Sequence, residues 1–511
     1  VKTVKDFFVG ILENPVGHTW WSVLSRVPLR ERMSVMGSLF LFRKVLPCSP
    51  SSPEDHRARL TAPAPSLPRG YLRHVRKVSY RLFKNWDRDY HRIVSTFVPE
   101  TSGCVEAPRS KGGARSQWLG AKNQYQSMVL GSSPLATTQL PPVKFQNVDG
   151  GGKSRSVTVA SADQCLLGPL HKTIYASISR QEWLLRGKAK ASAFREFVRS
   201  PGDCFVSGDY ESATDNLSLE VAKAIFEVLR RRATFVPDSV LQLGFNSLTA
   251  KITYPDGSTV EQTRGQLMGN YLSFPLLCVQ NYIAFRFFVS HEEVPDRLVR
   301  INGDDIVFRS SAEVKDRWMD GVSSTGLKLS PGKTLVYSSV FSLNSTFFHA
   351  RGRSVREIPV TRFANLGKPS SEFTPHSLGP ALRTFLRGFE GEARVRLETI
   401  YLRCRRPQIV ATGRSVLRDL RMSVSHEALQ RSGLVLRESW YLDSPPNPLP
   451  TDKTRVEGVI PKGWTRIDLP RVGRQACLSQ ESLFWTLVNE GAWETAVSKT
   501  TRARETWSCT V

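Results

Sequence analysis

The chain has 511 residues, more than one hydrophobic core usually supports, so its length predicts roughly two to four domains or subdomains. Lys and Arg number 71 against 46 acidic residues, and the formal net charge of +25 is spread along the sequence. Such a surface favours a polyanion, most simply nucleic acid, over a protein whose charge serves only solubility. Acidic clusters at 209–215 and 304–305 argue against a protein that merely coats nucleic acid, because clustered carboxylates repel phosphate.

Cysteine spacing and hydropathy argue against zinc-binding and membrane-spanning proteins. The eight cysteines form no C-x-x-C or zinc-like spacing, which is typical of a reduced, intracellular protein. The most apolar segment, 271–289, is broken by Pro275, Gln280, Asn281 and Arg286, so it predicts a buried helix and no membrane span. The N-terminus has the features of neither a signal peptide nor a transit peptide. The first residue is not Met, as expected of a fragment or a processed product.

Residues 1–99 are predicted to form an N-terminal extension. The first 46 residues have the pattern of amphipathic helix, and a Pro/Ser-rich linker is predicted over about 48–69. A second Pro-rich stretch covers 443–450. The residues that could carry catalytic chemistry lie between the two stretches, at about 140–350. An Arg-rich helical region follows over 376–437.

The first acidic cluster lies where a short strand is predicted to lead into a helix. Asp209 follows the apolar run that begins at Val206, which places its carboxylate at the edge of a sheet. Asp215 comes just before the helix, where the ordinary role of an Asp is N-cap. The apolar residues of that helix recur at helical spacing, at Leu219, Ala222, Phe226 and Leu229.

Residues 263–281 predict a glycine loop that enters a buried helix. Gly265 and Gly269 allow the backbone to approach a ligand closely. Ser273 is expected at the helix N-cap, and Pro275 is tolerated in the first turn. An ordinary loop-to-helix junction is the alternative for this segment. A functional role is favoured for Gly269, Asn270 and Ser273.

The second acidic cluster lies at the predicted tip of a β-hairpin. Asn302-Gly303 stands between two β-prone runs, which is a strong hairpin signal. The turn would direct Asp304 and Asp305 out of the sheet on the same side, and a solvated acidic turn is the alternative. Antiparallel pairing would bring them to Asp209, and three carboxylates could then hold two Mg²⁺ ions for an in-line displacement at phosphate.

The motifs Asp209-x5-Asp215, Gly265-Gln-Leu-Met-Gly269 with Ser273, and Gly303-Asp304-Asp305 occur in the order of motifs A, B and C of viral RNA-directed RNA polymerases. The residues of these motifs closely resemble those in polymerases of the ourmiavirus and botourmiavirus group, which is related to narnaviruses, mitoviruses and leviviruses. The resemblance implies an α+β right-hand fold with fingers, a palm built on an antiparallel sheet, and a helical thumb. It predicts fingers at 100–200, a palm at 201–350 with a fingers insertion at about 233–262, and an Arg-rich thumb and C-terminal region at 351–511.

The resemblance extends to three further segments. Residues 153–158 resemble motif F, in which Lys153 and Arg155 would line the path of the nucleoside triphosphate. A P-loop at 150–154 is rejected, because Asn147 replaces its first glycine and a β-prone run follows. Lys333 lies in a segment that resembles motif D and would protonate the pyrophosphate, a surface lysine being the alternative. Residues 341–345 resemble motif E, a strand that supports the primer end, with a plain edge strand as the alternative.

The resemblance also assigns ligands. Asp209, Asp304, Asp305 and the main-chain carbonyl of Tyr210 would bind Mg²⁺, with Mn²⁺ as a substitute. Asp215 would sense the ribose 2′-hydroxyl. The usual Asn partner of that acid is Leu277 in this chain, so Asn281, one helical turn further, is the expected replacement. Met268 stands where many relatives have Ser.

The predicted function is replication of a viral RNA genome from ribonucleoside triphosphates by two-metal nucleotidyl transfer. The expected partners are template RNA, product RNA and ribonucleoside triphosphates, with no obligate protein partner, and the expected location is the host cytoplasm rather than the mitochondrion. A reverse transcriptase or maturase is one alternative, although its usual Tyr-x-Asp-Asp is Asn302-Gly-Asp-Asp here. A non-catalytic RNA-binding protein that uses charge and Trp20, Trp21 and Trp118 is the other. A thumb face that grips the product duplex is predicted within 383–420, from Arg394, Arg396, Arg403, Arg405 and Arg406.

Overall fold

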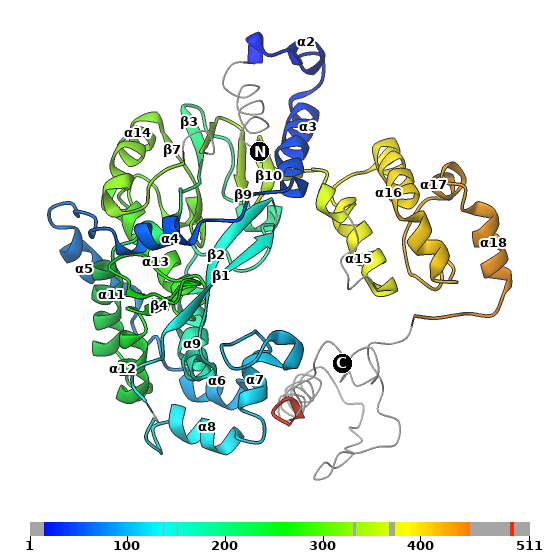
Figure 1. Ribbon diagram of the computed structural model, residues 1–511. Coiled ribbons are helices and arrows are strands. Elements are labelled where there is room, and N and C mark those ends of the chain that lie inside the picture. Colours follow the sequence, from blue (N-terminus) through cyan, green and yellow to red (C-terminus); the bar gives the residue numbers. More distant parts are fainter. Residues whose placement is uncertain are drawn as a thin grey trace, which may run out of the picture.

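The structure is a computed structural model, and it describes residues 15–135, 137–150, 152–330, 334–366, 374–449 and 491–494. A body of sheets and helices carries a separate group of four helices on one side (Figure 1). The fold is α+β, with three sheets among the described residues. None of the described helices is long and apolar enough to cross a lipid bilayer.

The central sheet has the strand order β6-β7-β3-β8, and all of its pairs are antiparallel. Its side chains alternate between two buried faces. Val206 and Phe308 point into the main helical core, whereas Phe205 and Val307 pack against the neighbouring sheet. The strands are β3 (Asp203–Gly208), β6 (Val299–Asn302), β7 (Asp305–Ser311) and β8 (Leu335–Tyr337).

Helices cover one face of this sheet. The segment predicted as a buried helix forms α13, which is buried on every side from Pro275 to Arg286. Trp86 Nε1 donates to the carbonyl oxygen of Leu229 at 3.2 Å, so residues of the predicted N-terminal extension belong to the main core. The main-core helices are α5 (Tyr71–Leu82), α6 (Tyr90–Thr96), α7 (Gly113–Gln117), α8 (Lys122–Val129), α9 (Gly168–Ile178), α11 (Leu219–Arg231), α12 (Asp238–Asn246), α13 (Ser273–Phe288) and α14 (Ala312–Gly321).

A second sheet has the order β2-β1-β4-β5. The long hairpin of β1 and β2 is antiparallel, and β1 pairs in parallel with β4, which comes from the predicted fingers insertion. The segment at 233–262 therefore joins the sheet of the preceding region. The strands are β1 (Val143–Gly150), β2 (Lys153–Val159), β4 (Lys251–Thr253) and β5 (Thr259–Glu261).

The third sheet has the order β11-β10-β9 and lies against the N-terminal helix α3 (Leu29–Phe42). Met33 and Met36 of α3 pack on Val340 and Ile358 of the sheet. The amphipathic pattern of the first 46 residues is thus realised as α2 (Trp21–Leu24) and α3, and residues 1–14 lie outside the described part. The strands are β9 (Val340–Leu343), β10 (Thr346–Arg351) and β11 (Ser354–Ile358).

The predicted linker at 48–69 contains a helix, α4 (Pro53–Thr61), so a linker over the whole stretch was wrong. The hydroxyl of Ser52 accepts a hydrogen bond from the amide of Asp55 at 3.1 Å, and Pro53 occupies the first helical position. Both features start helices. The Pro/Ser-rich composition concealed this start signal.

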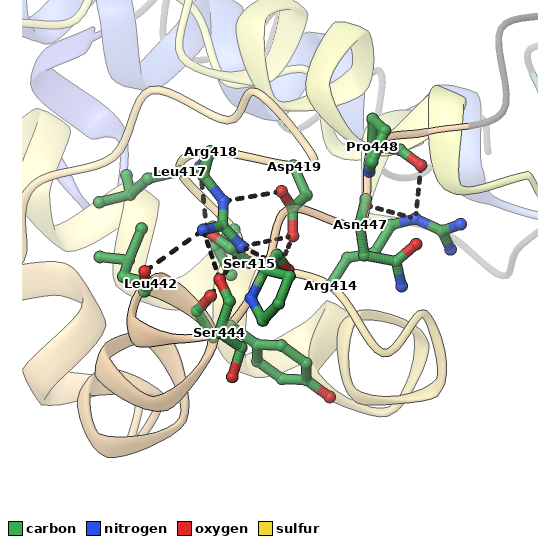
Figure 2. Close-up of polar contacts among 12 residues, drawn as sticks. Arg414, Ser415, Leu417, Arg418, Asp419, Leu442, Ser444, Asn447 and Pro448 are labelled. Atoms are coloured by element: carbon green, nitrogen blue, oxygen red, sulfur yellow. Dashed lines mark hydrogen bonds and ion pairs between the residues drawn. The ribbon is translucent and has the colours of Figure 1, made fainter.

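Four helices form a unit with a core of its own: α15 (Pro375–Phe385), α16 (Gly391–Ala411), α17 (His426–Arg431) and α18 (Val435–Asp443). Buried charged groups join α18 to the loop after α16 (Figure 2). Arg418 donates to Asp419 and to carbonyl oxygens at the end of α18, including that of Tyr441 at 2.7 Å. Glu438 accepts hydrogen bonds from Ser415 and from the amides of Val416 and Leu417.

Candidate active site

The acidic hairpin is formed by β6 and β7, and its turn lies one residue further than predicted. Asn302 pairs with Asp305, so the two turn residues are Gly303 and Asp304. Gly303 has φ of 68°, which matches a type II′ turn with glycine at its first central position. Asp305 is consequently the first residue of β7, and Asp304 lies in the turn itself.

Asp209 lies directly beside this hairpin. The ladder between β3 and β7 ends with Gly208 opposite Ile306, so the next step along the two strands places Asp209 opposite Asp305. The carbonyl oxygen of Asp209 accepts a hydrogen bond from the amide of Ser330 at 2.8 Å, which holds the end of β3 in place. The predicted convergence of the three carboxylates on one sheet edge is what the structure contains. The carbonyl of Tyr210 as a metal ligand stays a prediction.

The three carboxylates repel one another. Desolvation by the surrounding protein, then the charge of Asp209, raises the pKa of Asp304, although the residue keeps an open face at the turn. Burial, then the charges of Asp304 and Asp209, raises the pKa of Asp305 to about 7. Clustered carboxylates with raised pKa values are a candidate functional site.

The donor set suits a hard cation. Its side-chain ligands are carboxylate oxygens, which Mg²⁺ prefers. Among the described residues, no three His, Cys, Asp or Glu side chains lie close enough together to ligate one ion by themselves. Carbonyl, phosphate or water oxygens would complete the coordination, as is usual for Mg²⁺.

Two predicted cations face the carboxylates from β2. Lys153 and Arg155 lie close enough to Asp304 to oppose the rise of its pKa. Residues 153–159 form a strand paired antiparallel to β1, with no helix after the glycines. The rejection of a P-loop is therefore confirmed.

The glycine loop before α13 approaches protein, not an open ligand site. Gly269 has φ of 124°, and a Cβ there would lie 2.1 Å from the carbonyl oxygen of Thr158 on β2. A Cβ on Gly265 would meet the side chain of Leu60 and the carbonyl oxygen of Thr214. The two glycines are required because the loop packs against β2, α4 and the segment of Thr214 and Asp215.

Ser273 and Asn270 stabilise this loop. The helix begins at Ser273, so the expected N-cap role was wrong, and the Ser273 hydroxyl donates to the carbonyl oxygen of Leu267 at 2.8 Å. The Asn270 side chain accepts from the amide of Leu272 at 2.8 Å and donates to the carbonyl oxygen of Ser247 at 2.7 Å. Their contact with nucleotide stays a prediction.

Asp215 is part of a short helix, α10 (Ala213–Asn216), and is not a cap. The N-cap position of α11 is occupied by Ser218, which excludes the ordinary cap role for Asp215. Arg59 of α4 donates through Nε to Asp215 at 2.8 Å. The side chain of Asp215 is 15% exposed, so a small group could still reach it.

Asn281 is completely buried and does not pair with Asp215, so the expected partnership was wrong. Its side-chain oxygen accepts from the Tyr210 hydroxyl at 3.0 Å. Its side-chain nitrogen donates to the carbonyl oxygens of Gly303 at 3.1 Å and Asp304 at 2.9 Å. Asn281 therefore joins the residue after Asp209 to the turn that carries Asp304, and it has no surface for nucleotide in this structure.

Two predicted segments remain, one around Lys333 and one at 341–345. Lys333 is outside the described residues, which stop at 330 and resume at 334. The strand predicted at 341–345 is β9, an edge strand of the third sheet. The amide of Asn344, just after β9, donates to Asp305 at 3.2 Å.

Three cations from the N-terminal region lie near the acidic residues and were not predicted. Arg43 lies close to Asp209 and Lys44 close to Asp305, and Arg59 pairs with Asp215. No local pattern marks them, because basic residues are common throughout the chain. Only the tertiary structure brings them to the acidic clusters.

Comparisons with known proteins agree with the motifs. No protein-family model matches the chain. The chain is 33% identical over 181 residues to the RNA-dependent RNA polymerase of Ourmia melon virus (isolate Melon/Iran/VE9), covering 32% of this chain and 21% of that protein. It is 26% identical over 195 residues to the RNA-directed RNA polymerase of Saccharomyces 20S RNA narnavirus, covering 36% of this chain and 23% of that protein. The matches span less than a quarter of the length of these curated relatives.

The fold is that of a viral RNA-dependent RNA polymerase. The crystal structure of the RNA-dependent RNA polymerase of a human picorbirnavirus matches with a TM-score of 0.54 and 12% sequence identity, over 83% of this chain and 89% of that chain. The predicted right-hand fold and the resemblance to ourmiavirus and narnavirus polymerases are thereby confirmed. The predicted domain boundaries stay predictions.

Proposed function

We propose that the chain is a viral RNA-directed RNA polymerase that copies RNA from ribonucleoside triphosphates. The observation that carries this proposal is the set of Asp209, Asp304 and Asp305 on adjacent strands, which repel one another and face Lys153 and Arg155. The likeness to RNA-dependent RNA polymerases of Ourmia melon virus and of a narnavirus supports it.

The carboxylates would hold divalent cations. Asp209, Asp304 and Asp305, with the carbonyl of Tyr210, would bind Mg²⁺, for which Mn²⁺ can substitute. Bound ions of this kind activate a 3′-hydroxyl and neutralise charge on the attacked phosphate. The turn at Gly303 and the Asn281 hydrogen bond to the main-chain carbonyl of Asp304 would support this role by holding the backbone that carries Asp304.

Other side chains would bind the nucleotide and select ribonucleotides over deoxyribonucleotides. Lys153 and Arg155 would neutralise the triphosphate as charge-assisted donors. Asp215 would accept a hydrogen bond from the ribose 2′-hydroxyl, the group that distinguishes RNA precursors from DNA precursors. Gly269, Asn270 and Ser273 would shape the neighbouring loop, and Lys333 would give a proton to the departing pyrophosphate.

The test is RNA synthesis by purified protein with an RNA template, Mg²⁺ and ribonucleotides. Asp304→Ala should abolish complementary RNA while leaving template binding nearly intact. Asp320→Ala, an exposed acid on α14, is the matched control and should retain activity. Equal activity in Asp304→Ala would refute the site.

The same assay separates the alternatives. Synthesis only from deoxynucleotides would indicate a reverse transcriptase. Salt-sensitive RNA binding without any Mg²⁺-dependent synthesis would indicate a non-catalytic RNA-binding protein. We further propose that replication takes place in the host cytoplasm, and recovery of the protein in purified mitochondria would contradict this.

We also propose that the four-helix unit grips the product duplex, with a narrower set of arginines than predicted. Arg405 is buried and donates to the carbonyl oxygen of Asn365 at 3.0 Å, so it serves structure. Arg394 and Arg396 form i,i+4 ion pairs on α16, and Arg403 donates to the carbonyl oxygen of Arg431. Arg406 is exposed, and the side chain of Arg396 is 67% exposed despite its ion pair, against 40% for Arg394. Arg406 and Arg396 are therefore the first to neutralise, and unchanged salt dependence of RNA binding would argue against this grip.

A further inference from the structure

The 3₁₀ turn η2 (Arg43–Val45) follows α3 and crosses beside the acidic clusters. The end of α3 and the start of η2 are held in place by the segment between β11 and α15. Ser38 of α3 accepts from the amide of Thr361 at 2.8 Å. The ring of Phe42 stacks edge-on against Phe363, with centroids 5.3 Å apart. The position of η2 is therefore built into the fold.

The other side of the segment is attached to the β1–β2 hairpin. A Cβ on Gly152, at φ of 70°, would lie 2.2 Å from the carbonyl oxygen of Arg43. Only glycine fits at this close approach. Further along, Ser51 and Asn147 exchange two hydrogen bonds of 2.7 Å each. The segment from 43 to 51 thus lies against the β1–β2 hairpin, which carries Lys153 and Arg155. Through Lys44 it also contacts the β9–β10 turn.

Two half-buried cations project from η2. The ammonium of Lys44 lies 3.0 Å from the hydroxyl of Ser345, in the turn whose neighbour Asn344 donates to Asp305. The guanidinium of Arg43 lies 4.1 Å from the centre of the Phe40 ring, and its buried Nε has no hydrogen-bond partner among the described residues. The negative charge of Asp209 favours the charged form of Arg43, and that of Asp305 favours the charged form of Lys44, although burial lowers both pKa values.

This arrangement leaves the cations without anions during the proposed reaction. With divalent ions bound, the carboxylates would no longer compensate the charges of Arg43 and Lys44, and half-buried cations need another anion. Phosphate is the anion that a nucleotide supplies, and both cations donate to it readily. Lys153 and Arg155 lie on β2, whereas Lys44 contacts Ser345 in the β9–β10 turn. The positive charge of Arg155 adds to the lowering of the Lys44 pKa, so an anion bound at Lys44 would also relieve the repulsion between these two cations.

We propose that Arg43 and Lys44 bind a phosphate of the nucleotide that carries the attacking 3′-hydroxyl. This inference rests on the proposed polymerase function, and it adds a substrate contact that the motifs do not contain. The phosphate belongs either to the backbone of a primer strand or to the triphosphate of an initiating nucleotide. Both sources present the same charged oxygens to the pair.

The experiment compares Lys44→Gln, Arg43→Gln and the double variant with wild type. Arg26→Gln is the matched control, because Arg26 is exposed in the same N-terminal region. Reactions are run with an RNA primer on a template, and separately with template and nucleotides alone. Loss of one charge-assisted contact predicts a KM for the primer, or for the initiating nucleotide, raised about tenfold to a hundredfold. The KM for the next incoming nucleotide should stay within about twofold of wild type.

A binding measurement without synthesis accompanies the kinetics. The affinity of a fluorescent primer–template for each variant is measured in Ca²⁺ buffer, and Lys44→Arg, which keeps the charge, should restore most of the loss. The arm that shows the raised KM identifies the source of the phosphate. Lower affinity for the incoming nucleotide alone, or faster initiation in the double variant, would overturn the inference.

The two failures are distinguishable. If wild type makes RNA and Lys44→Gln matches it in both arms, the inference fails and the proposed function stands. If wild type makes no RNA, the proposed function fails. Equal primer–template affinity of wild type and the double variant would then overturn the inference as well.

Discussion

Asn281 connects the two acidic segments of the site through one side chain, so its truncation tests how the carboxylates are held. Asn281→Ala removes the hydrogen bond from the Tyr210 hydroxyl and the two donated to Gly303 and Asp304. The Tyr210 hydroxyl and the Gly303 carbonyl are buried, and each unpaired buried group costs about 1–3 kcal/mol. The Asp304 carbonyl is partly buried and can recover water. The expected loss in the free energy of unfolding is about 3–5 kcal/mol.

Urea denaturation followed by tryptophan fluorescence measures this loss near the site. Trp183 stacks on Tyr282 of the helix that carries Asn281, with ring centroids 4.2 Å apart, and is one of the eleven tryptophans whose summed emission follows unfolding. Tyr210→Phe removes only one of the three hydrogen bonds and should cost about 1–2 kcal/mol. Combined with Asn281→Ala it should add less than its own cost, because both changes break the same bond.

Activity should fall more steeply than stability. At temperatures where Asn281→Ala stays folded, the turn that carries Asp304 loses its tie to the strand of Asp209, and kcat should drop at least about tenfold. Asn246→Ala is the control, because its side chain donates to the carbonyl oxygen of Thr138 at an exposed site and accepts from Gln242 at a partly buried one, where water can replace the lost partners. If the free energy of unfolding of Asn281→Ala lies within about 0.5 kcal/mol of the wild-type value, the reasoning is refuted.

Three further outcomes follow from the same structure. Gly269→Ala should lower the free energy of unfolding by more than about 3 kcal/mol in thermal unfolding, because its Cβ would meet the Thr158 carbonyl. Gly70→Ala is the control, since Gly70 also has positive φ but lies in open space, and it should cost about 1 kcal/mol. Asp305→Asn should stabilise the protein in metal-free buffer by roughly 1–3 kcal/mol at neutral pH while reducing synthesis, because it removes a buried, partly ionised carboxyl group that Asp304 and Asp209 repel. A destabilised variant in urea titration would contradict this. Burial lowers the pKa of His56, so the unfolded chain binds the proton more readily, and stability should decline as pH falls below about 6.5. His56→Gln should flatten that decline in pH-dependent denaturation, and an unchanged profile would exclude His56 as its source.

The acidic hairpin could be predicted because its signals are local. Asn302-Gly303 between β-prone runs indicates a two-residue turn, and the carboxylates follow it directly. The one-residue error arose because both Asn302-Gly303 and Gly303-Asp304 can form such turns. The observed pairing of Asn302 with Asp305 leaves Gly303 at the position that needs positive φ.

The partners of Asp215 and Asn281 could not be predicted, because they depend on contacts distant in sequence. Arg59 lies 156 positions before Asp215, and nothing in either segment marks the other. Asn281 lies 71 positions after Tyr210, and helical periodicity shows only that it shares a face with Leu277. Its three hydrogen bonds depend on how α13 packs under the hairpin.

The region that the motifs leave unassigned supplies a cation to three of the four acidic residues of the site. Arg43 lies by Asp209, Lys44 by Asp305, and Arg59 by Asp215. Motifs A, B and C identify residues that share a short stretch of chain, so a boundary drawn from them alone would separate the carboxylates from these cations. The charge balance of the acidic site therefore belongs to the whole fold, and residues 43–59 are part of the site although their sequence carries no motif.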